Sequence, residues 1–286
     1  MRPSGKARLA AVIGWPVAQS LSPRLHGHWL EAYGIDGLFL PLAVRPENFS
    51  AVVGGLRLAG FQGISVTLPH KEAAVALAHR LGADARAAGA ANLLVFRSDG
   101  TMDGLNTDVA GFARSLSEEG VSLRGNVAVL LGAGGAARAV ALGLAAGGAR
   151  EIRVFNRHRA RAQTLVRELS PFVIAKLKAH GFEDWPEAAG DASLVVNATS
   201  AGMAGAPGPD LSLEPLPAGV AICDIVYNPL ETDLLKRARG RGFKTIDGLG
   251  MLMHQAAPAF CAFFGVEPAV TPQLRRELEQ ALSHDA

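Results

Sequence analysis

A strand, a glycine-rich turn and a helix follow one another in the middle of the chain, and this segment restricts the possible folds more than any other. Residues 127–131 are apolar and β-branched in their first part, which indicates a buried strand. Six small residues follow at 132–137, and a helix of small residues comes next. Because a second strand is expected at 151–155, the pattern predicts a βαβ unit and therefore a parallel sheet.

The same region allows one alternative. Residues 127–149 are long enough and apolar enough to span a bilayer, with Arg138 as their only charge. The glycines cluster directly after the apolar strand residues, however, so we interpret the segment as strand, tight turn and helix rather than as a membrane span.

The turn matches the dinucleotide fingerprint, with Ala137 at the third glycine position, where a small side chain lets helix and strand pack closely. In this motif the backbone approaches the pyrophosphate, which lies at the N-terminus of the helix. We therefore predict that a dinucleotide binds to Gly132, Ala133, Gly134, Gly135 and Ala136.

The end of the second strand distinguishes the two nicotinamide cofactors. Folds that bind NAD usually carry an acidic residue there for the ribose hydroxyls, whereas an arginine accommodates the additional phosphate of NADP. No acidic residue lies between Phe155 and Arg167. Instead the segment contains Asn156, Arg157, Arg159 and Arg161. The sequence therefore favours NADP.

Strands and helices alternate over most of the chain, which at 286 residues suits two domains. In the first part we expect strands at 8–14, 38–44, 63–66 and 93–96, a hairpin partner from 102, and helices at 22–33, 46–58, 69–79 and 109–118. In the second part we expect further strands at 173–177, 192–197, 221–226 and 244–246, and helices at 159–169, after 229, at 251–264 and at 271–282.

These elements predict an α/β protein with two domains. We expect an N-terminal α/β substrate domain at residues 1–110 and a Rossmann-type, doubly wound nucleotide-binding domain at 111–248. The closing helix is amphipathic, so we expect residues 249–286 to pack back on the first domain.

Composition excludes several other classes of protein. The net charge is +2 and the basic residues are scattered, so no basic stripe indicates binding to nucleic acid or to a membrane. Cys223 and Cys261 lie in apolar runs without a CxxC motif or a histidine at ligand spacing. We expect buried thiols in a reducing compartment, no metal site and no export signal, and hence a cytoplasmic protein.

Two polar segments follow strands of the first domain. The loop 14–23 contains Ser20 and Ser22, and Ser22-Pro23 has the form of a helix N-cap followed by proline at the first helical position. Lys71 lies in the first turn of a helix, where the partial positive charge of the helix end disfavours a cation. Asp108 lies at a second strand-to-helix turn, and we predict that it meets Lys71 in an oxidoreductase site.

Ten short motifs occur in one order along nearly the whole chain. In the first half they are 13–17, 20–26, 66–71, 89–92 and 106–108; in the second half they are 132–136, 156–157, 197–203, 224–229 and 247–255. In this order and spacing the sequence resembles the shikimate dehydrogenase family.

The resemblance implies a hydride transfer between NADPH and 3-dehydroshikimate, a step of the chorismate pathway to aromatic amino acids. It implies that Lys71 and Asp108 are the catalytic pair. It implies substrate contacts from Ser20, Ser22, Ser65, Thr67, Asn92, Asp108, Tyr227 and Gln255. It implies cofactor contacts from Gly132 to Ala136, Asn156, Arg157, Arg161, Thr199, Ile225 and Gly248. The partners expected are small molecules, with a monomer or a homodimer both open.

The chain departs from the family pattern at five positions, which are Gln19, Gly27, Ser65, Leu93 and Val109. Gln19 and Ser65 lie near the expected substrate loops, so quinate, which carries one more hydroxyl, is an alternative substrate, as is an amino-substituted relative. A quinate/shikimate dehydrogenase with relaxed cofactor choice is therefore one alternative. The other is a non-catalytic protein that binds the ligand and regulates a partner.

Overall fold

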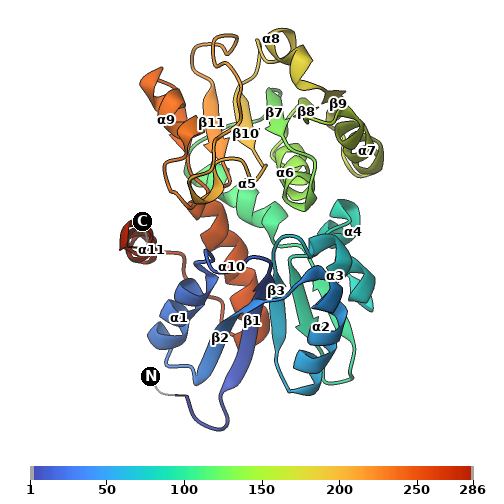
Figure 1. Ribbon diagram of the computed structural model, residues 1–286, viewed down its shortest axis with the longest axis vertical. Helices are drawn as coiled ribbons and strands as arrows, with labels where there is room; N and C mark the ends of the chain where they lie inside the picture. Colours follow the sequence, from blue (N-terminus) through green and yellow to red (C-terminus); the bar gives the residue numbers. More distant parts are fainter. Residues whose placement is uncertain (1–2, 285–286) are drawn as a thin grey trace. The chain divides into compact units, whose positions relative to one another are not determined.

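The computed structural model describes residues 3–284 and divides into two compact units. The chain up to Thr107 and the segment Met253–Ala281 form unit 1, and Asp108–Leu252 form most of unit 2. Each unit contains one sheet with helices packed on it, as Figure 1 shows. The prediction of a two-domain α/β fold is confirmed.

Unit 1 is built on a mixed sheet with the strand order β2-β1-β3-β5-β6-β4. Its strands are β1 (Arg8–Gly14), β2 (Gly37–Ala43), β3 (Gly63–Val66), β4 (Arg80–Leu81), β5 (Leu93–Phe96) and β6 (Met102–Leu105). Its helices are α1 (Ser22–Ala32), η1 (Pro46–Asn48), α2 (Phe49–Leu58), α3 (Lys71–Leu77) and α4 (Ala83–Ala88). The strands β1, β2 and β3 are parallel, whereas β5 runs antiparallel to both β3 and β6.

Unit 2 is built on a fully parallel sheet with the order β12-β11-β10-β7-β8-β9, which is the doubly wound arrangement that we predicted. Its strands are β7 (Val127–Leu131), β8 (Glu151–Phe155), β9 (Lys176–His180), β10 (Leu194–Asn197), β11 (Ala221–Asp224) and β12 (Lys244–Ile246). Its helices are α5 (Asp108–Glu118), α6 (Gly135–Ala146), α7 (Arg159–Leu169), η2 (Ser170–Phe172), η3 (Phe182–Asp184), α8 (Trp185–Ala188), η4 (Met203–Gly205) and α9 (Asp233–Gly240).

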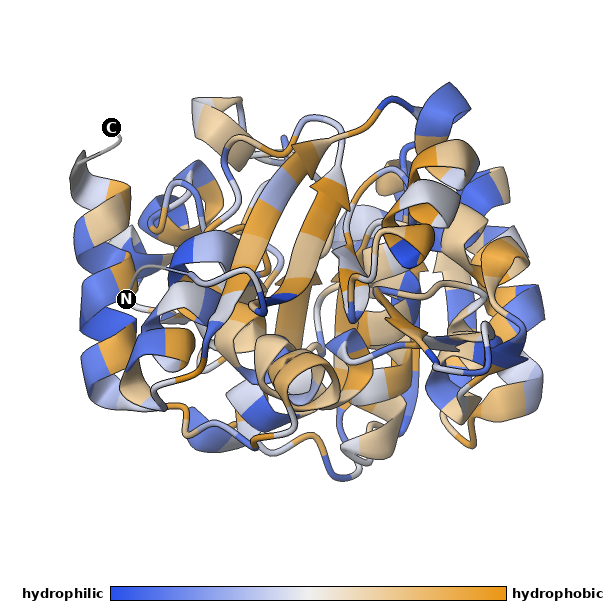
Figure 2. Ribbon diagram, turned by 90° about the horizontal axis from the view of Figure 1, so that it is seen from below, coloured by the Kyte–Doolittle hydropathy of each residue, from blue (hydrophilic) through white to orange (hydrophobic). Residues whose placement is uncertain are grey.

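Burial of apolar strands on both faces explains this architecture. All five residues of β7 are buried, as expected for a central strand that helices cover on both sides. Figure 2 shows hydrophobic colour along the central strands, while the helices around them alternate between hydrophobic and hydrophilic residues. In α6 the small residue Gly143 permits close packing, since a Cβ there would lie 3.0 Å from the Phe112 ring of α5.

The last two helices are α10 (Leu249–Phe264) and α11 (Pro272–His284). The Trp29 indole of α1 donates a hydrogen bond to the carbonyl of Ala269, which precedes α11, at 3.0 Å. Within α11, Glu277 Oε2 lies 2.7 Å from His28 Nδ1. Both contacts join the segment Met253–Ala281, which belongs to unit 1, to α1.

A histidine lies inside the aromatic core of unit 1. His26 is 1% exposed, stacks on the Phe39 ring at 3.8 Å between centroids, and meets the edge of Trp29 at 5.8 Å. Its Nδ1 atom has no hydrogen-bond partner among the described residues. Burial lowers the pKa of His26 to about 3, because no partner compensates the imidazolium for the loss of water.

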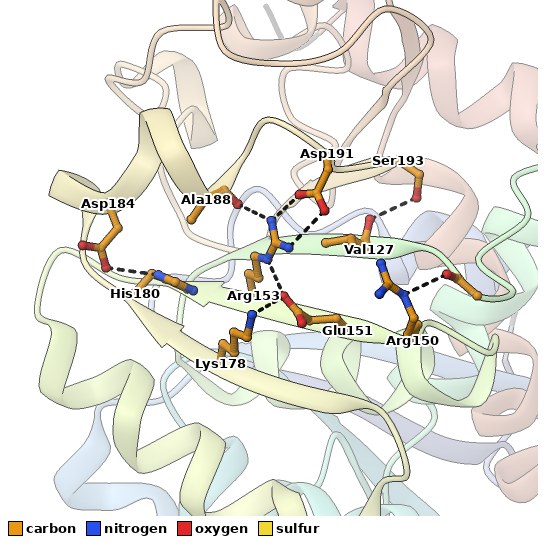
Figure 3. Close-up of polar contacts among 11 residues, drawn as sticks. Val127, Arg150, Glu151, Arg153, Lys178, His180, Asp184, Ala188, Asp191 and Ser193 are labelled. Carbon is orange, nitrogen blue, oxygen red and sulfur yellow. Dashed lines mark hydrogen bonds and ion pairs between the residues drawn. The ribbon is translucent and has the colours of Figure 1, made fainter.

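A cluster of charged residues joins the outer strands of unit 2 (Figure 3). The Arg153 guanidinium donates to Glu151 at 2.6 Å, to the Ala188 carbonyl at 2.9 Å and to Asp191 at 3.2 Å, and Lys178 Nζ lies 2.9 Å from Glu151. Burial acts to raise the pKa of Glu151, but the hydrogen bonds from Lys178 and Arg153 hold it below its ordinary value. These contacts connect β8 and β9 to the segment that leads into β10.

The structure differs from the expected elements most clearly at the strand expected at 173–177 and in the segment 69–88. The strand expected at 173–177 is Lys176–His180, because its register is set by pairing with β8, while apolar Ile174 is fully exposed. The helix expected to reach His79 ends at Leu77, because the His79 backbone N–H donates to the Met102 carbonyl at 2.8 Å. The strand β4 and the helix α4 follow this early end and have no counterpart among the predicted elements.

Two predicted side-chain environments also need correction. Ser22 is the first residue of α1 rather than its N-cap, which is Leu21, and the Ser20 hydroxyl accepts a hydrogen bond from the Ser22 backbone N–H at 3.3 Å. Cys223 is buried as expected, but Cys261 is only partly buried. Burial raises the pKa of the Cys223 thiol well above its ordinary value, so this thiol is inert.

The buried histidine predicts a pH-dependent stability. Its folded-state pKa of about 3 lies below the unfolded value of 6.5, so below pH 6.5 the unfolded chain binds a proton that the folded chain does not. The unfolding free energy should therefore fall by about 1.4 kcal/mol for each pH unit below that value through this group. Urea denaturation of His26→Phe and wild type between pH 7 and pH 4.5 measures the difference in slope.

The variant Phe263→Leu is the control, since it disturbs the same aromatic cluster without removing a titratable group, and it should keep the wild-type slope. Equal slopes for wild type and His26→Phe would contradict the assignment of this pH dependence to His26.

Candidate functional site

In unit 1 the loops that follow β1 and β3 lie against each other. A Cβ at Gly14 would lie 2.5 Å from the Thr67 methyl group, so any larger residue at this position would displace Thr67. The Trp15 backbone N–H also donates to the Leu68 carbonyl at 3.1 Å. The segment that carries Ser20 is thereby placed next to the segment that carries Thr67.

Lys71 is the first residue of α3, and the backbone connects it to the next strand. Its carbonyl accepts a hydrogen bond from the Ala91 N–H at 2.8 Å, and the Asn92 carbonyl accepts one from Val66 at 2.7 Å. The Lys71 side chain is partly exposed, while Asn92 is 4% exposed. The structure therefore brings together two of the predicted site residues, Lys71 and Asn92.

Thr107 and Gln255 hold the Asn92 amide by hydrogen bonds. Asn92 Nδ2 donates to the Thr107 hydroxyl at 2.9 Å and to Gln255 Oε1 at 3.2 Å, and Asn92 Oδ1 accepts from the Thr107 backbone N–H at 2.8 Å. The Asn92 side chain is thus fixed in one orientation. Because the Gln255 oxygen accepts from Asn92, the amide nitrogen forms the donor end of the Gln255 side chain. Thr107 was not among the predicted site residues, although it lies inside the motif 106–108.

The remaining predicted residues of unit 1 differ in their burial. Ser22 is 7% exposed, whereas the side chains of Ser20, Ser65 and Thr67 are partly exposed. Ser65 lies on β3, where it is paired with Val12 on one side and with Leu93 on the other.

Asp108 belongs to the other unit. It is the first residue of α5, where a carboxylate is favoured by the partial positive charge of the helix end, and it is 4% exposed. Tyr227 also lies in unit 2 and is partly buried. Lys71 and Asp108 therefore come from different units, and their meeting stays a prediction.

The glycine-rich turn of unit 2 has the geometry that close backbone approach requires. Gly132 has a φ of +115°, its N–H donates to the Phe155 carbonyl at 2.8 Å, and a Cβ there would lie 2.9 Å from the Ala198 carbonyl oxygen. At Gly134, by contrast, a Cβ would meet nothing within 4 Å.

The helix that starts at this turn has its N-terminus beside an exposed glycine, Gly134. The 12-residue helix α6 begins directly after Gly134, so its first backbone N–H groups and its dipole are directed at the open space beside that glycine. Ala133, Gly135 and Ala136 are partly exposed there. These residues fit the pyrophosphate of a dinucleotide.

The arginines after β8 differ in whether they form ion pairs. Arg159 lies 3.3 Å from Glu183 and 3.1 Å from Asp184, whereas Arg157 and Arg161 are exposed and have no ion-pair partner among residues 3–284. The guanidinium groups of Arg157 and Arg161 are therefore available to bind a phosphate. The preceding Asn156 uses its side-chain oxygen to accept the His158 backbone N–H at 2.9 Å, which turns the chain at this point.

The predicted residues Thr199, Ile225 and Gly248 lie on three loops that also touch one another. The Ile225 N–H donates to the Asn197 carbonyl at 3.0 Å, and a Cβ at Gly248 would lie 2.2 Å from the Ile225 oxygen. A Cβ at Gly132 would lie 3.2 Å from the Thr199 methyl group. The structure therefore brings these three residues together with the glycine turn.

Two buried polar residues beneath these loops were not among the predicted site residues. Asn197 and Asp224 are both 0% exposed and are joined by a hydrogen bond of 3.0 Å from the amide to the carboxylate. Burial raises the pKa of Asp224, while donation from Thr232, Asn197 and Val226 acts in the opposite direction. Their sequence signal was a polar residue that ends an otherwise apolar strand.

Neither a metal centre nor a membrane span is found in the part of the chain that the structure describes. Among residues 3–284, no group of three or more His, Cys, Asp or Glu side chains is arranged to hold a metal ion. None of the described helices has the length and apolar character needed to cross a membrane.

Two family models match the chain. Residues 12–94 match the family described as shikimate dehydrogenase substrate binding domain, and residues 114–204 match the family described as shikimate / quinate 5-dehydrogenase. The first match lies in unit 1 and the second lies in unit 2.

Known proteins resemble the chain over nearly its whole length. The shikimate dehydrogenase (NADP(+)) of Paramagnetospirillum magneticum is 50% identical over 279 residues, which cover 95% of this chain and 98% of that protein. The crystal structure of shikimate 5-dehydrogenase from Thermus thermophilus, in complex with NADP(H) and shikimate, matches with a TM-score of 0.84 and 36% identity, covering 96% of this chain and 99% of that one. Quinate dehydrogenase from Corynebacterium glutamicum, in complex with NAD, matches with a TM-score of 0.86 and 31% identity, covering 97% and 99%.

The two glycines of the turn should respond differently to alanine. Gly132→Ala places a methyl group against the Ala198 carbonyl at a positive φ, so the unfolding free energy should fall by about 1–3 kcal/mol. Gly134 has a φ of −94°, which suits alanine, so Gly134→Ala should change stability by less than about 0.5 kcal/mol. Thermal and urea denaturation measure both changes.

Calorimetric titration with NADP supplies the second readout. The methyl group of Gly134→Ala enters the space in front of α6, so this variant should keep its stability and lose dinucleotide affinity. Unchanged affinity in Gly134→Ala would place the dinucleotide elsewhere.

Proposed function

The chain belongs to the shikimate dehydrogenase family, and from this premise we propose that it catalyses the NADP-dependent, reversible reduction of 3-dehydroshikimate to shikimate. The observation that carries the proposal is the extent of the likeness, because it covers the unit with Lys71 and Asn92 as well as the unit with the glycine turn. The enzyme is thus an oxidoreductase of the chorismate pathway.

Unit 1 would act as the substrate domain. The hydroxyls of Ser20, Ser22, Ser65 and Thr67 and the amides of Asn92 and Gln255 are donors and acceptors suited to a cyclic acid that carries several hydroxyl groups. The hydrogen bonds from Asn92 to Thr107 and Gln255 orient these amides before substrate arrives, which reduces the entropic cost of binding. The Tyr227 hydroxyl would add a contact from unit 2.

Unit 2 would hold NADP. The first turn of α6 and the residues Gly132, Ala133, Gly134, Gly135 and Ala136 would bind the pyrophosphate, and Asn156, Arg157 and Arg161 would bind the adenosine end with its 2′-phosphate. Thr199, Ile225 and Gly248 would contact the nicotinamide end. When bound, the reduced nicotinamide supplies the hydride that the ketone carbon accepts.

Lys71 would transfer the proton, and Asp108 would orient Lys71 for that transfer. Reduction of a ketone requires a proton on the oxygen, which the Lys71 ammonium can donate when it lies within hydrogen-bond reach. In the oxidation direction the neutral Lys71 amine removes the hydroxyl proton. The Asp108 carboxylate would orient the lysine and accept a hydrogen bond from a ring hydroxyl of the substrate.

Quinate is the second candidate substrate. The likeness to a quinate dehydrogenase, together with the departures Gln19 and Ser65 near the substrate loops, supports testing it.

We further propose that the protein acts in the cytoplasm on these small molecules, as a monomer or a homodimer.

The wild-type protein should oxidise shikimate faster than quinate, and with NADP⁺ rather than NAD⁺. Initial rates of cofactor reduction at alkaline pH, with both acids and both cofactors, measure this preference.

The double variant Arg157→Ala/Arg161→Ala should lose the preference for NADP⁺, since it removes the two guanidinium groups that have no ion-pair partner among the described residues. The control Arg159→Ala should keep it, because Arg159 pairs with Glu183 and Asp184. Tight binding of shikimate without turnover on either acid would favour a non-catalytic regulator instead.

Removal of the proton donor should separate chemistry from binding. Lys71→Ala should lower kcat by about 10²–10⁴-fold, the usual contribution of one general acid or base, while shikimate still binds measurably. Steady-state kinetics and equilibrium titration with shikimate give the two values. Glu72→Ala, at the exposed next position of the same helix, is the control and should retain turnover. A Lys71→Ala variant with near-normal kcat would exclude Lys71 from the mechanism.

A further inference from the structure

A single buried carboxylate in unit 2 accepts three hydrogen bonds, one from the end of β10 and two from the connection between β11 and α9. Asp224 Oδ1 accepts from Asn197 Nδ2 at 3.0 Å and from the Val226 backbone N–H at 3.0 Å, and Asp224 Oδ2 accepts from the Thr232 hydroxyl at 2.7 Å. Asp224, Asn197 and Thr232 are all 0% exposed. We refer to these three residues as the Asp224 network.

The network controls the loop after β10 through the Asn197 amide. Asn197 Oδ1 accepts from the Thr199 backbone N–H at 3.1 Å and from its hydroxyl at 2.7 Å, while Asn197 Nδ2 also donates to the Ala201 carbonyl at 3.2 Å. An amide can adopt this orientation or the reverse one. Because a carboxylate only accepts hydrogen bonds, Asp224 requires the Asn197 nitrogen to face it and therefore directs the Asn197 oxygen toward Thr199.

The network also controls the loop after β11 and its connection to α9. The hydrogen bond from the Val226 N–H ties the chain directly after β11 to Asp224, and the Thr232 hydroxyl accepts from the Leu235 N–H at 3.4 Å as the N-cap of α9. The two loops are joined directly by a hydrogen bond of 2.8 Å from the Ala204 N–H to the Asn228 carbonyl. One carboxylate thus sets the relative position of both loops.

We propose that Asp224, Asn197 and Thr232 are positioning residues that hold the loops 198–204 and 225–229 in the geometry needed for hydride transfer. The inference rests on the proposed function, in which Thr199 and Ile225 contact the nicotinamide end of NADP. The hydrogen bonds of the Asp224 carboxylate go to Asn197, Val226 and Thr232, whereas the residues assigned to the adenosine end lie after β8. The role of the network is therefore confined to the reacting half of the cofactor.

Two conservative variants remove the hydrogen bond between Thr232 and Asp224, one by changing the acceptor and the other by changing the donor. Asp224→Asn keeps an oxygen for Asn197 and Val226 but leaves the Thr232 hydroxyl without its acceptor. Thr232→Val removes the hydroxyl and keeps the shape of the side chain. Thr232→Ser is the matched control, because it retains the hydroxyl that donates to Asp224 and accepts from Leu235.

The experiment compares NADP⁺ with 2′,5′-ADP, which carries the adenosine end and the 2′-phosphate but no nicotinamide. Asp224→Asn and Thr232→Val should lower kcat for shikimate oxidation by about 10–100-fold, since small displacements of reacting groups cost about this much. They should also weaken NADP⁺ binding several-fold, and leave the inhibition constant of 2′,5′-ADP within about twofold. Thr232→Ser should behave as wild type.

The outcomes separate this inference from the proposed function. Parallel loss of affinity for NADP⁺ and 2′,5′-ADP would show a merely structural role, and wild-type kcat in both variants would overturn the positioning role. If the wild-type protein fails to oxidise shikimate, the proposed function fails, and calorimetric titration of the same variants with NADP⁺ and 2′,5′-ADP still supports or overturns the inference. If Asp224→Asn does not fold, Thr232→Val decides the result alone.

Discussion

The loops at the carboxyl ends of the strands approach one another more closely than a side chain would permit, and the site residues depend on this approach. A Cβ at Gly14 would lie 2.5 Å from the Thr67 methyl group. A Cβ at Gly132 would lie 2.9 Å from the Ala198 oxygen, and one at Gly248 would lie 2.2 Å from the Ile225 oxygen. Real Cβ contacts are longer than these, so a side chain at any of the three positions would displace the Thr67 side chain or the backbone that it meets. In parallel sheets these strand ends are where ligands bind.

Each unit then uses one buried polar side chain to orient the loops that glycine brings together. In unit 1 the Asn92 amide binds Thr107 and Gln255, and in unit 2 the Asp224 carboxylate binds Asn197, Val226 and Thr232. A buried polar group without a partner costs free energy, so such groups adopt the one arrangement that satisfies all of them. The loops gain a defined geometry without the rigidity of secondary structure.

Much of the fold was predictable because its strands and helices have strong periodic patterns. The helix Arg159–Leu169 and the strands Glu151–Phe155 and Lys244–Ile246 lie where the sequence predicted them. The glycine turn was recognised because its chemistry is local. Predictions were wrong where the end or the register of an element depends on a hydrogen-bond partner that is distant in the sequence. The early end of α3 follows from pairing of His79 with Met102, and the position of β9 follows from its register with β8.

The sequence by itself determined the fold class, the family and the residue types that bind and react, because periodicity, the glycine turn and short motifs are properties of neighbouring residues. The tertiary structure alone decided which of these side chains are free to act. Arg159 is held by Glu183 and Asp184 whereas Arg157 and Arg161 are uncommitted, and Asn197 and Asp224 lie beneath the loops as their support. Hydrogen bonds and ion pairs join residues far apart in the chain, so their partners are settled only when the sheet has assembled.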